Sequence, residues 1–230
     1  LLAPYYATDM AQIDWARRRL APELQRLAQS GFAADAPHRL VERATGLYAY
    51  WGGEDLPLHR ALARFWRRVT PDLCWTAPHI AHWQPPAGRR PRVAYVTHFI
   101  FNHTVDRMFG GIARRLPELG FELRVFSSYA GRSPERAQIE AAAGPIVTLP
   151  DDLAAARQAI ADFAPDIAIY PELGLHPFTY FLAFARLAPL QITSWGHAAT
   201  SGLDSIDVFL GSSMLDPPGA ERFYSEELVR

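Results

Sequence analysis

The sequence predicts an α/β protein in which a doubly wound parallel sheet follows a small all-α segment. Residues 1–83 carry helical patterns of apolar side chains, and residues 84–91 hold three prolines and a glycine that interrupt any regular element. From residue 92 onward, β-rich runs alternate with helical segments, as in right-handed βαβ units. We therefore expect a Rossmann-like sheet with helices on both faces.

The chain is expected to divide into a helical lead-in (1–83), a linker (84–91) and a sheet domain (92–230). The lead-in has no clean repeat of about 34 residues, so any tetratricopeptide-like character would be degenerate. Three helices are expected in the lead-in. The first carries its apolar face on Ile13, Leu20, Leu24 and Leu27 and ends at Gly31, and the second runs from about Pro37 to Tyr50. The third begins after Asp55 and carries its apolar face on Leu58, Leu62 and Val69.

The sheet domain is expected to hold six strands with helices between them. The expected strands are Arg92–Thr97, Glu122–Ser128, Ile146–Leu149, Asp166–Tyr170, Leu190–Trp195 and Asp207–Gly211. The expected helices are Arg107–Leu119, Pro134–Ala143, Asp152–Phe163 and Pro177–Arg186.

Composition narrows the choice of partners. The net charge of −1 offers no electrostatic footprint for nucleic acid, and no apolar stretch is long enough to span a membrane. Cys74 is the single cysteine, so no disulfide can form within the chain, which fits a reducing cytoplasm. His79 and His82 have the spacing of a metal pair but lack nearby cysteine or carboxylate partners, so no metal site is expected.

Candidate site residues follow from the rule that functional groups of such sheets lie beyond the carboxyl ends of the strands. The rule selects the loops after the first, fourth and fifth expected strands, which contain four of the eight histidines. A neutral histidine can take a proton from a hydroxyl near pH 7. Neither a GxGxxG fingerprint nor a P-loop is present, which disfavours a dinucleotide or P-loop nucleotide site. The candidates are His98, His103, Gly196, His197, Thr200 and Ser201.

Several short motifs follow one another along the expected sheet domain. They are Asn102-His103, followed by Thr104, and then Leu187–Gln191, Trp195–Gly202, Asp207 and Tyr224–Leu228. In this order they resemble motifs of the O-GlcNAc transferase/SPINDLY family of protein glycosyltransferases. Asn102-His103 resembles that family's Asn-His-Pro, with Thr104 in place of the proline. The resemblance covers roughly residues 92–230.

The resemblance implies the N-terminal, acceptor-side half of a GT-B glycosyltransferase, whose second, donor-binding Rossmann-like domain is absent from this chain. It implies an inverting, metal-independent transfer of N-acetylglucosamine, glucose or fucose from a nucleotide sugar, such as a UDP-sugar, to a protein or peptide hydroxyl. His103 is then the candidate catalytic residue, while His98, Gly196, His197, Thr200 and Ser201 would bind substrate or donor. The isolated chain of 230 residues is expected to be inactive.

Three alternatives stay open at this point. The first is a catalytically silent relative that binds sugar nucleotides or peptides. The second is a protein-interaction adaptor whose partners contact the N-terminal helices. The third is another enzyme of GT-B architecture, such as a sugar-nucleotide epimerase.

Overall fold

The computed structural model describes residues 7–42, 45 and 48–230. The α-helices are α1 (Met10–Gln29), α2 (Pro37–Leu40), α3 (Leu56–Val69), α4 (Thr104–Arg115), α5 (Pro134–Ala143), α6 (Leu153–Ala161) and α7 (Pro177–Leu182). Short 3₁₀ turns are η1 (Tyr48–Tyr50), η2 (Pro71–Leu73), η3 (Pro78–His82), η4 (Leu116–Leu119) and η5 (Ala220–Phe223). The strands are β1 (Arg92–Thr97), β2 (Glu122–Ser127), β3 (Val147–Thr148), β4 (Ile167–Tyr170), β5 (Leu190–Ser194), β6 (Val208–Leu210) and β7 (Glu227–Val229).

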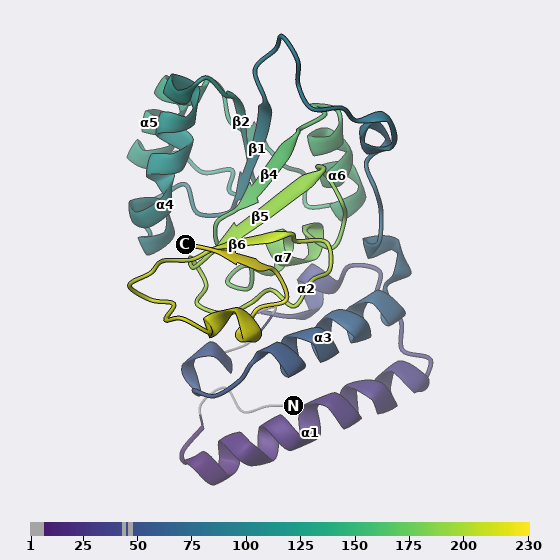
Figure 1. The fold of residues 1–230 in the computed structure, drawn as a ribbon. Helices are drawn as coiled ribbons and strands as arrows, with labels where there is room; N and C mark the ends of the chain where they lie inside the picture. The colour runs from purple at the N-terminus through teal and green to yellow at the C-terminus, as the bar shows by residue number, and fades with distance from the viewer. Residues whose placement is uncertain (1–6, 43–44, 46–47) are drawn as a thin grey trace.

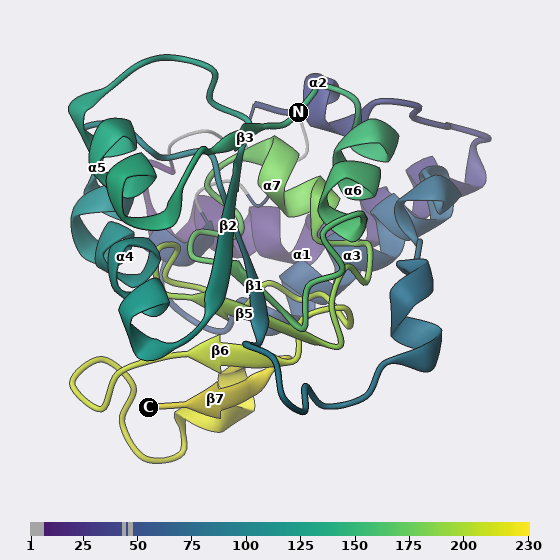
Figure 2. The same cartoon turned by 90° about the horizontal axis from the view of Figure 1, so that it is seen from above.

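The strands form one parallel sheet of seven, in the order β3-β2-β1-β4-β5-β6-β7 (Figures 1 and 2). The chain moves outward from β1 to β3, then returns to place β4 on the other side of β1. The direction of winding therefore reverses between β1 and β4, and this is where ligand crevices form in such sheets. The predicted α/β, Rossmann-like class is confirmed.

The alternation of side chains along β1 explains how both faces of the sheet are covered. Val93 and Tyr95 point into a cluster with residues of α4 and α5, whereas Ala94 and Val96 belong to the larger cluster on the opposite face. That larger cluster includes residues of α6 and α7. Figure 1 shows α4 and α5 on one side of the sheet and α6 on the other.

The helices of the lead-in pack on the α6/α7 side and extend the same apolar cluster. One link is Trp66 of α3, whose ring meets Phe181 of α7 edge to face with 4.9 Å between centroids. The backbone of the lead-in also pairs with the segment after α7. Arg186 N–H donates to Trp75 O at 2.7 Å, and Ala77 N–H donates to Arg186 O at 2.9 Å. One continuous core thus runs from α1 to the sheet. Within the described residues, no helix combines the length and apolar character needed to cross a membrane.

The structure departs from the predicted elements in three places. The helix expected over 37–50 is wrong: α2 ends at Leu40, Val41 is extended, and Thr45 is drawn into hydrogen bonds with other loops. Residues 43–44 and 46–47 of that expected helix lie outside the described residues. Helix α7 stops before Arg186 because Arg186 is needed for the backbone pairing with 75–77. Strand β7 was not predicted.

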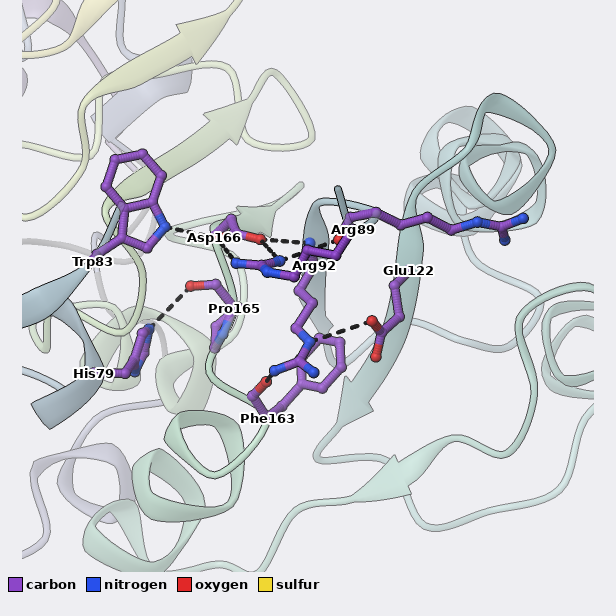
Figure 3. Close-up of polar contacts among 9 residues, drawn as sticks. His79, Trp83, Arg89, Arg92, Glu122, Phe163, Pro165 and Asp166 are labelled. Atoms are coloured by element: carbon purple, nitrogen blue, oxygen red, sulfur yellow. Dashed lines mark hydrogen bonds and ion pairs between the residues drawn. The ribbon is translucent and has the colours of Figure 1, made fainter. Parts of the chain in front are cut away.

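A buried carboxylate fixes the linker to the sheet (Figure 3). The Asp166 side chain, just before β4, is only 3% exposed and accepts a bidentate pair of hydrogen bonds from Arg89 at 2.6 and 2.8 Å. It also accepts from Trp83 Nε1 at 2.6 Å and from the Arg92 backbone N–H at 2.7 Å. His79 adds a hydrogen bond from Nε2 to Pro165 O at 3.0 Å, so this histidine joins the lead-in to the same segment. The division at 84–91 stays a prediction, but the linker is held at both ends.

We expect Asp166→Asn to lower the free energy of unfolding by about 2–4 kcal/mol, because buried donors lose a charged acceptor. Urea unfolding at pH 7 measures the change. Asp162→Asn, at an exposed carboxylate of the same segment, is the matched control and is expected to cost less than about 0.5 kcal/mol.

The same contact has a pH signature. Burial alone would raise the pKa of Asp166, but hydrogen bonds from Arg89, Arg92 and Trp83 outweigh it and lower the pKa to about 2. The unfolded value is about 3.9, so the stabilisation is complete above that pH and is lost as the pH falls toward 2. The stability gap between wild type and Asp166→Asn should therefore narrow between about pH 4 and pH 2. A gap that stays constant over this range would contradict the assignment.

Candidate functional site

The candidate site lies at the carboxyl ends of β1, β4 and β5, around the reversal between β1 and β4. The loop after β1 and the loop after β4 meet through two histidines. The rings of His98 and His176 stack with centroids 3.8 Å apart and planes within 4°. His98 Nδ1 also lies 2.9 Å from Ser128 Oγ, in the loop after β2. Three loops are thereby joined at the switch point.

These stacked histidines are neutral at physiological pH. Burial lowers the pKa of His176 to about 4, and the neighbouring His98 adds to the effect. Burial, followed by the charge of His103, lowers the pKa of His98 as well. Two neutral rings can stack closely without repulsion, which makes this pair a structural joint between the loops.

A cleft of about 500 Å³ opens beside this joint, and His103 lies on its wall. Its other lining residues are Glu42, Tyr50, Phe99, Thr104, Val105, Met108, Leu175 and Gly196. The lining combines apolar side chains with the polar groups of Glu42, Tyr50, His103 and Thr104, and it comes from the lead-in as well as from the loops after β1, β4 and β5. A cleft that brings apolar surface and polar groups together from several loops is a candidate ligand site.

A hydrogen bond and neighbouring aromatic rings orient His103. It is the N-cap of α4, where its Nδ1 accepts from Val105 N–H at 3.2 Å. Its ring lies on Phe99, with 4.1 Å between centroids and an interplanar angle of 21°. Burial lowers the pKa of His103, so the ring is neutral near pH 7. Because Nδ1 is an acceptor, the proton of the neutral ring resides on Nε2.

Glycine is required at position 196 because the backbone there lies close to the Pro171 carbonyl oxygen. The Gly196 N–H donates to Pro171 O at 3.0 Å, and a Cβ at this position would lie 2.2 Å from that same oxygen. The glycine therefore lets the loop after β5 press against the loop after β4. This N–H is not available to a ligand.

The other candidates in the Gly196–Gly202 loop face inward. His197, Thr200 and Ser201 are 4%, 2% and 1% exposed. The side chains of His197 and Thr200 therefore do not open into the cleft that His103 lines. His103 and Gly196 do line one cleft, and His98 stands behind it in the stacked pair.

Thr200 and Ser201 are held by a carboxylate that sequence reasoning did not single out. Glu226, just before β7, accepts from Thr200 Oγ1 at 2.6 Å and from Ser201 N–H at 2.8 Å, and it also bonds the Ser201 hydroxyl. Glu226 is 6% exposed. It stands inside the Tyr224–Leu228 motif, so the motif itself was the available indication.

Glu172, in the loop after β4, is a second carboxylate buried beside the site. A loop acid is usually solvated, yet Glu172 is fully buried, and its Oε1 accepts from His98 N–H at 3.2 Å. Burial raises its pKa to about 8, against the opposing hydrogen bonds from His98, Thr97 and Thr179. Glu172 is thus mostly protonated at pH 7 and supports the loop after β1 from below.

Comparison with known proteins agrees with this geometry. No protein-family model matches the sequence. A solved O-GlcNAc transferase from Thermobaculum terrenum (its K341M mutant) superposes on 96% of the chain with a TM-score of 0.64 and 20% sequence identity. Two plant proteins described as probable UDP-N-acetylglucosamine–peptide N-acetylglucosaminyltransferase SPINDLY, from Solanum lycopersicum and Petunia hybrida, are each 47% identical over 45 residues, or 20% of the chain. The fold of the chain therefore resembles that of an O-GlcNAc transferase, and a short stretch of its sequence resembles SPINDLY proteins.

The chain spans only part of the length of the proteins that it matches. It covers 41% of the Thermobaculum chain, and the matched segment is 5% of each plant protein. The structural likeness accounts for the fold of almost the whole chain, and the sequence likeness is confined to a short stretch. What the complete relatives do is therefore treated below as a proposal for this chain.

We expect Gly196→Ala to destabilise the protein by about 1–3 kcal/mol, because the new methyl group would overlap a backbone carbonyl that cannot move freely. Thermal and urea unfolding measure this. Gly111→Ala in α4 is the matched control, since nothing lies within 4 Å of its added Cβ. That change is expected to stabilise by about 0.5–1 kcal/mol through helix propensity. Equal effects at both glycines would contradict the close-approach explanation.

Glu172→Gln should stabilise the protein increasingly as the pH rises. The folded state keeps a proton on Glu172 up to about pH 8, whereas the unfolded chain loses it near pH 4.3, so wild-type stability falls between these values. Glutamine keeps an acceptor for His98 N–H and carries no charge. Urea unfolding from pH 5 to pH 8 should show a widening advantage for the variant. Exposed Glu118→Gln is the control, with changes below about 0.5 kcal/mol. An advantage independent of pH would contradict the burial of an ionisable carboxyl.

Proposed function

We propose that this region forms the acceptor side of an inverting glycosyltransferase that moves N-acetylglucosamine from UDP to a Ser or Thr hydroxyl of a protein. The single observation that carries the proposal is the placement of His103, within a motif resembling this family, on the wall of a cleft at the switch point of the sheet. The names of the plant relatives support the choice of donor and of a peptide acceptor. Glucose and fucose are the competing sugars.

The reaction balances without a redox partner or metal. The acceptor oxygen forms a bond to the anomeric carbon, while the bond from that carbon to the diphosphate oxygen breaks and its electron pair leaves with UDP. The hydroxyl proton departs to a base or to solvent. Since attack and departure occur on opposite faces of the sugar, the configuration inverts.

The geometry favours an orienting role for His103. Because Nδ1 accepts from Val105 N–H, the neutral ring carries its proton on Nε2, and we infer that this donor faces the acceptor in the cleft that His103 lines. Proton uptake at Nε2 would require the ring proton to move to Nδ1, where it would face the Val105 N–H. We infer that His103 donates a hydrogen bond that fixes the acceptor oxygen, and that the proton leaves by another route. Orientation of this kind contributes strongly to rate.

The apolar side chains of the cleft would exclude water from the reacting groups. Phe99, Met108 and Leu175 surround the position of His103 and limit hydrolysis of the donor by bulk water. Charge on the departing diphosphate would be stabilised mainly by the donor-binding domain that the resemblance implies.

Transfer by the full-length protein tests the proposal. UDP-N-acetylglucosamine, UDP-glucose and GDP-fucose would each be incubated with Ser/Thr peptide mixtures, and intact mass would report the added sugar. We expect a mass increase with UDP-N-acetylglucosamine that EDTA leaves unchanged. The isolated chain of 230 residues is the matched comparison and should give no measurable transfer. Donor binding without transfer by the full-length protein would instead support a silent binding module.

His103→Asn separates the N-cap role of this residue from its proposed role as a hydrogen-bond donor to the acceptor. Asparagine is a good N-cap and preserves the bond to Val105, but it places no donor at the Nε2 position. We expect kcat to fall by about 10²-fold or more with a small effect on donor KM, because the acceptor loses its orienting group. His103→Ala should lose the cap as well and be at least as impaired.

His103→Gln is the complementary variant. Its amide nitrogen reaches the Nε2 position, so it should retain more activity than asparagine if donation is the role. If His103→Ala leaves kcat unchanged in a folded protein, His103 is only the cap of α4 and the catalytic assignment is wrong.

A further inference from the structure

The Gly196–Gly202 loop is held from behind by the helical lead-in. His59 of α3 is fully buried, and its Nδ1 lies 2.5 Å from Thr200 O. A carbonyl oxygen can only accept, so Nδ1 carries the proton and donates. Burial lowers the pKa of His59 to about 4, which keeps the ring neutral in this place.

The backbone of α3 approaches the same loop with almost no intervening side chain. Gly202 has φ +70°, and an added Cβ there would lie 2.6 Å from the carbonyl carbon of His59. Only glycine adopts this conformation readily and leaves room for the helix. The loop is thus fitted to the position of His59.

The lead-in makes a second contact at the start of the loop. Thr45 Oγ1 lies 3.1 Å from His197 Nε2 and 3.3 Å from Gly174 O, so it links the loop after β5 to the loop after β4. An added Cβ at Gly174 would lie 2.5 Å from the His197 ring. The ring therefore fills a fitted slot between the lead-in and the loop after β4.

Thr200 is the point where both sides of this support meet. Its hydroxyl donates to Glu226, and its carbonyl accepts from His59. Loss of the His59 donor would leave a buried carbonyl without its partner, which is more costly than the bond itself is favourable. The Glu226 side is provided by the sheet domain and the His59 side by the lead-in.

We propose that His59 is a positioning residue, through which the helical lead-in sets the conformation of the Gly196–Gly202 loop. The lead-in is then part of the site's framework. The catalytic consequence rests on the proposed function, whereas the effect on the loop does not.

Amide hydrogen exchange tests this in the chain itself. His59→Leu keeps an apolar side chain but removes the donor, and His59→Asn places an amide N–H near the position of Nδ1. Thr70→Val is the matched control, because it removes a buried hydrogen bond of 2.8 Å to Ala34 O inside the lead-in, away from the loop. The readout is the exchange rate of the hydrogen-bonded amides of Ser201, Gly202 and Leu203.

We expect His59→Leu to accelerate exchange at these amides by about tenfold or more, with His59→Asn restoring most of the protection. Thr70→Val should leave them unchanged even if it lowers Tm equally. The proposal is overturned if His59→Leu has no effect on these amides, or if Thr70→Val accelerates them as much.

Kinetics of the full-length protein form a separate arm. If it transfers sugar, His59→Leu should lower kcat and His59→Asn should restore it. If wild type transfers no sugar, the proposed function fails while hydrogen exchange still decides the role of His59. Normal kcat in His59→Leu, with accelerated exchange, would overturn the catalytic part of the proposal.

Discussion

The Asp166 carboxylate is the constraint on which the arrangement of the chain depends. This one buried side chain accepts hydrogen bonds from Trp83 at the end of the lead-in, from Arg89 in the linker and from the first backbone N–H of β1. It therefore fixes where the lead-in ends and where the sheet begins. Its own residue opens β4, the neighbour of β1. A carboxylate so far from water persists only when its oxygens are fully hydrogen-bonded. The register of the two strands that flank the switch point is therefore set at their amino ends, opposite the site.

Parallel strands transmit this constraint to the other edge of the sheet. Because β1 and β4 are fixed beside each other, the loops that follow them must meet, and the stacked His98–His176 pair is the result. The lead-in, bound at the same amino ends, then folds back over α7 to reach the loop after β5 through His59. The two ends of the sheet are thus linked by the lead-in as well as by the strands.

Sequence patterns predicted the helices and strands well where the local spacing of apolar residues determines them. The strands from β1 to β6 and the long helices follow from β-rich runs, apolar stripes and caps such as Asp152, and the edge that holds the site follows from the parallel topology. Sequence patterns did not predict the features that depend on hydrogen bonds between distant parts of the chain. Thr45 serves His197 rather than a helix, Glu172 is buried rather than solvated, and the side chains of Thr200 and Ser201 turn toward Glu226. Direction of a loop side chain depends on partners far along the chain, which no local period encodes.

The inward direction of those polar groups changes what the Gly196–Gly202 loop can do. The N–H of Gly196 donates to Pro171 O, and the N–H of Ser201 donates to the Glu226 carboxylate. These two groups therefore stabilise the loop and are not available to bind a ligand. A loop fixed at so many points loses little conformational entropy when a substrate arrives, which is the benefit of preorganisation. The chemistry must then fall to groups that still face the cleft. Among the predicted residues in the described part of the chain, His103 combines an oriented ring with a place on the cleft wall, which makes its asparagine and glutamine variants the decisive comparison for the site.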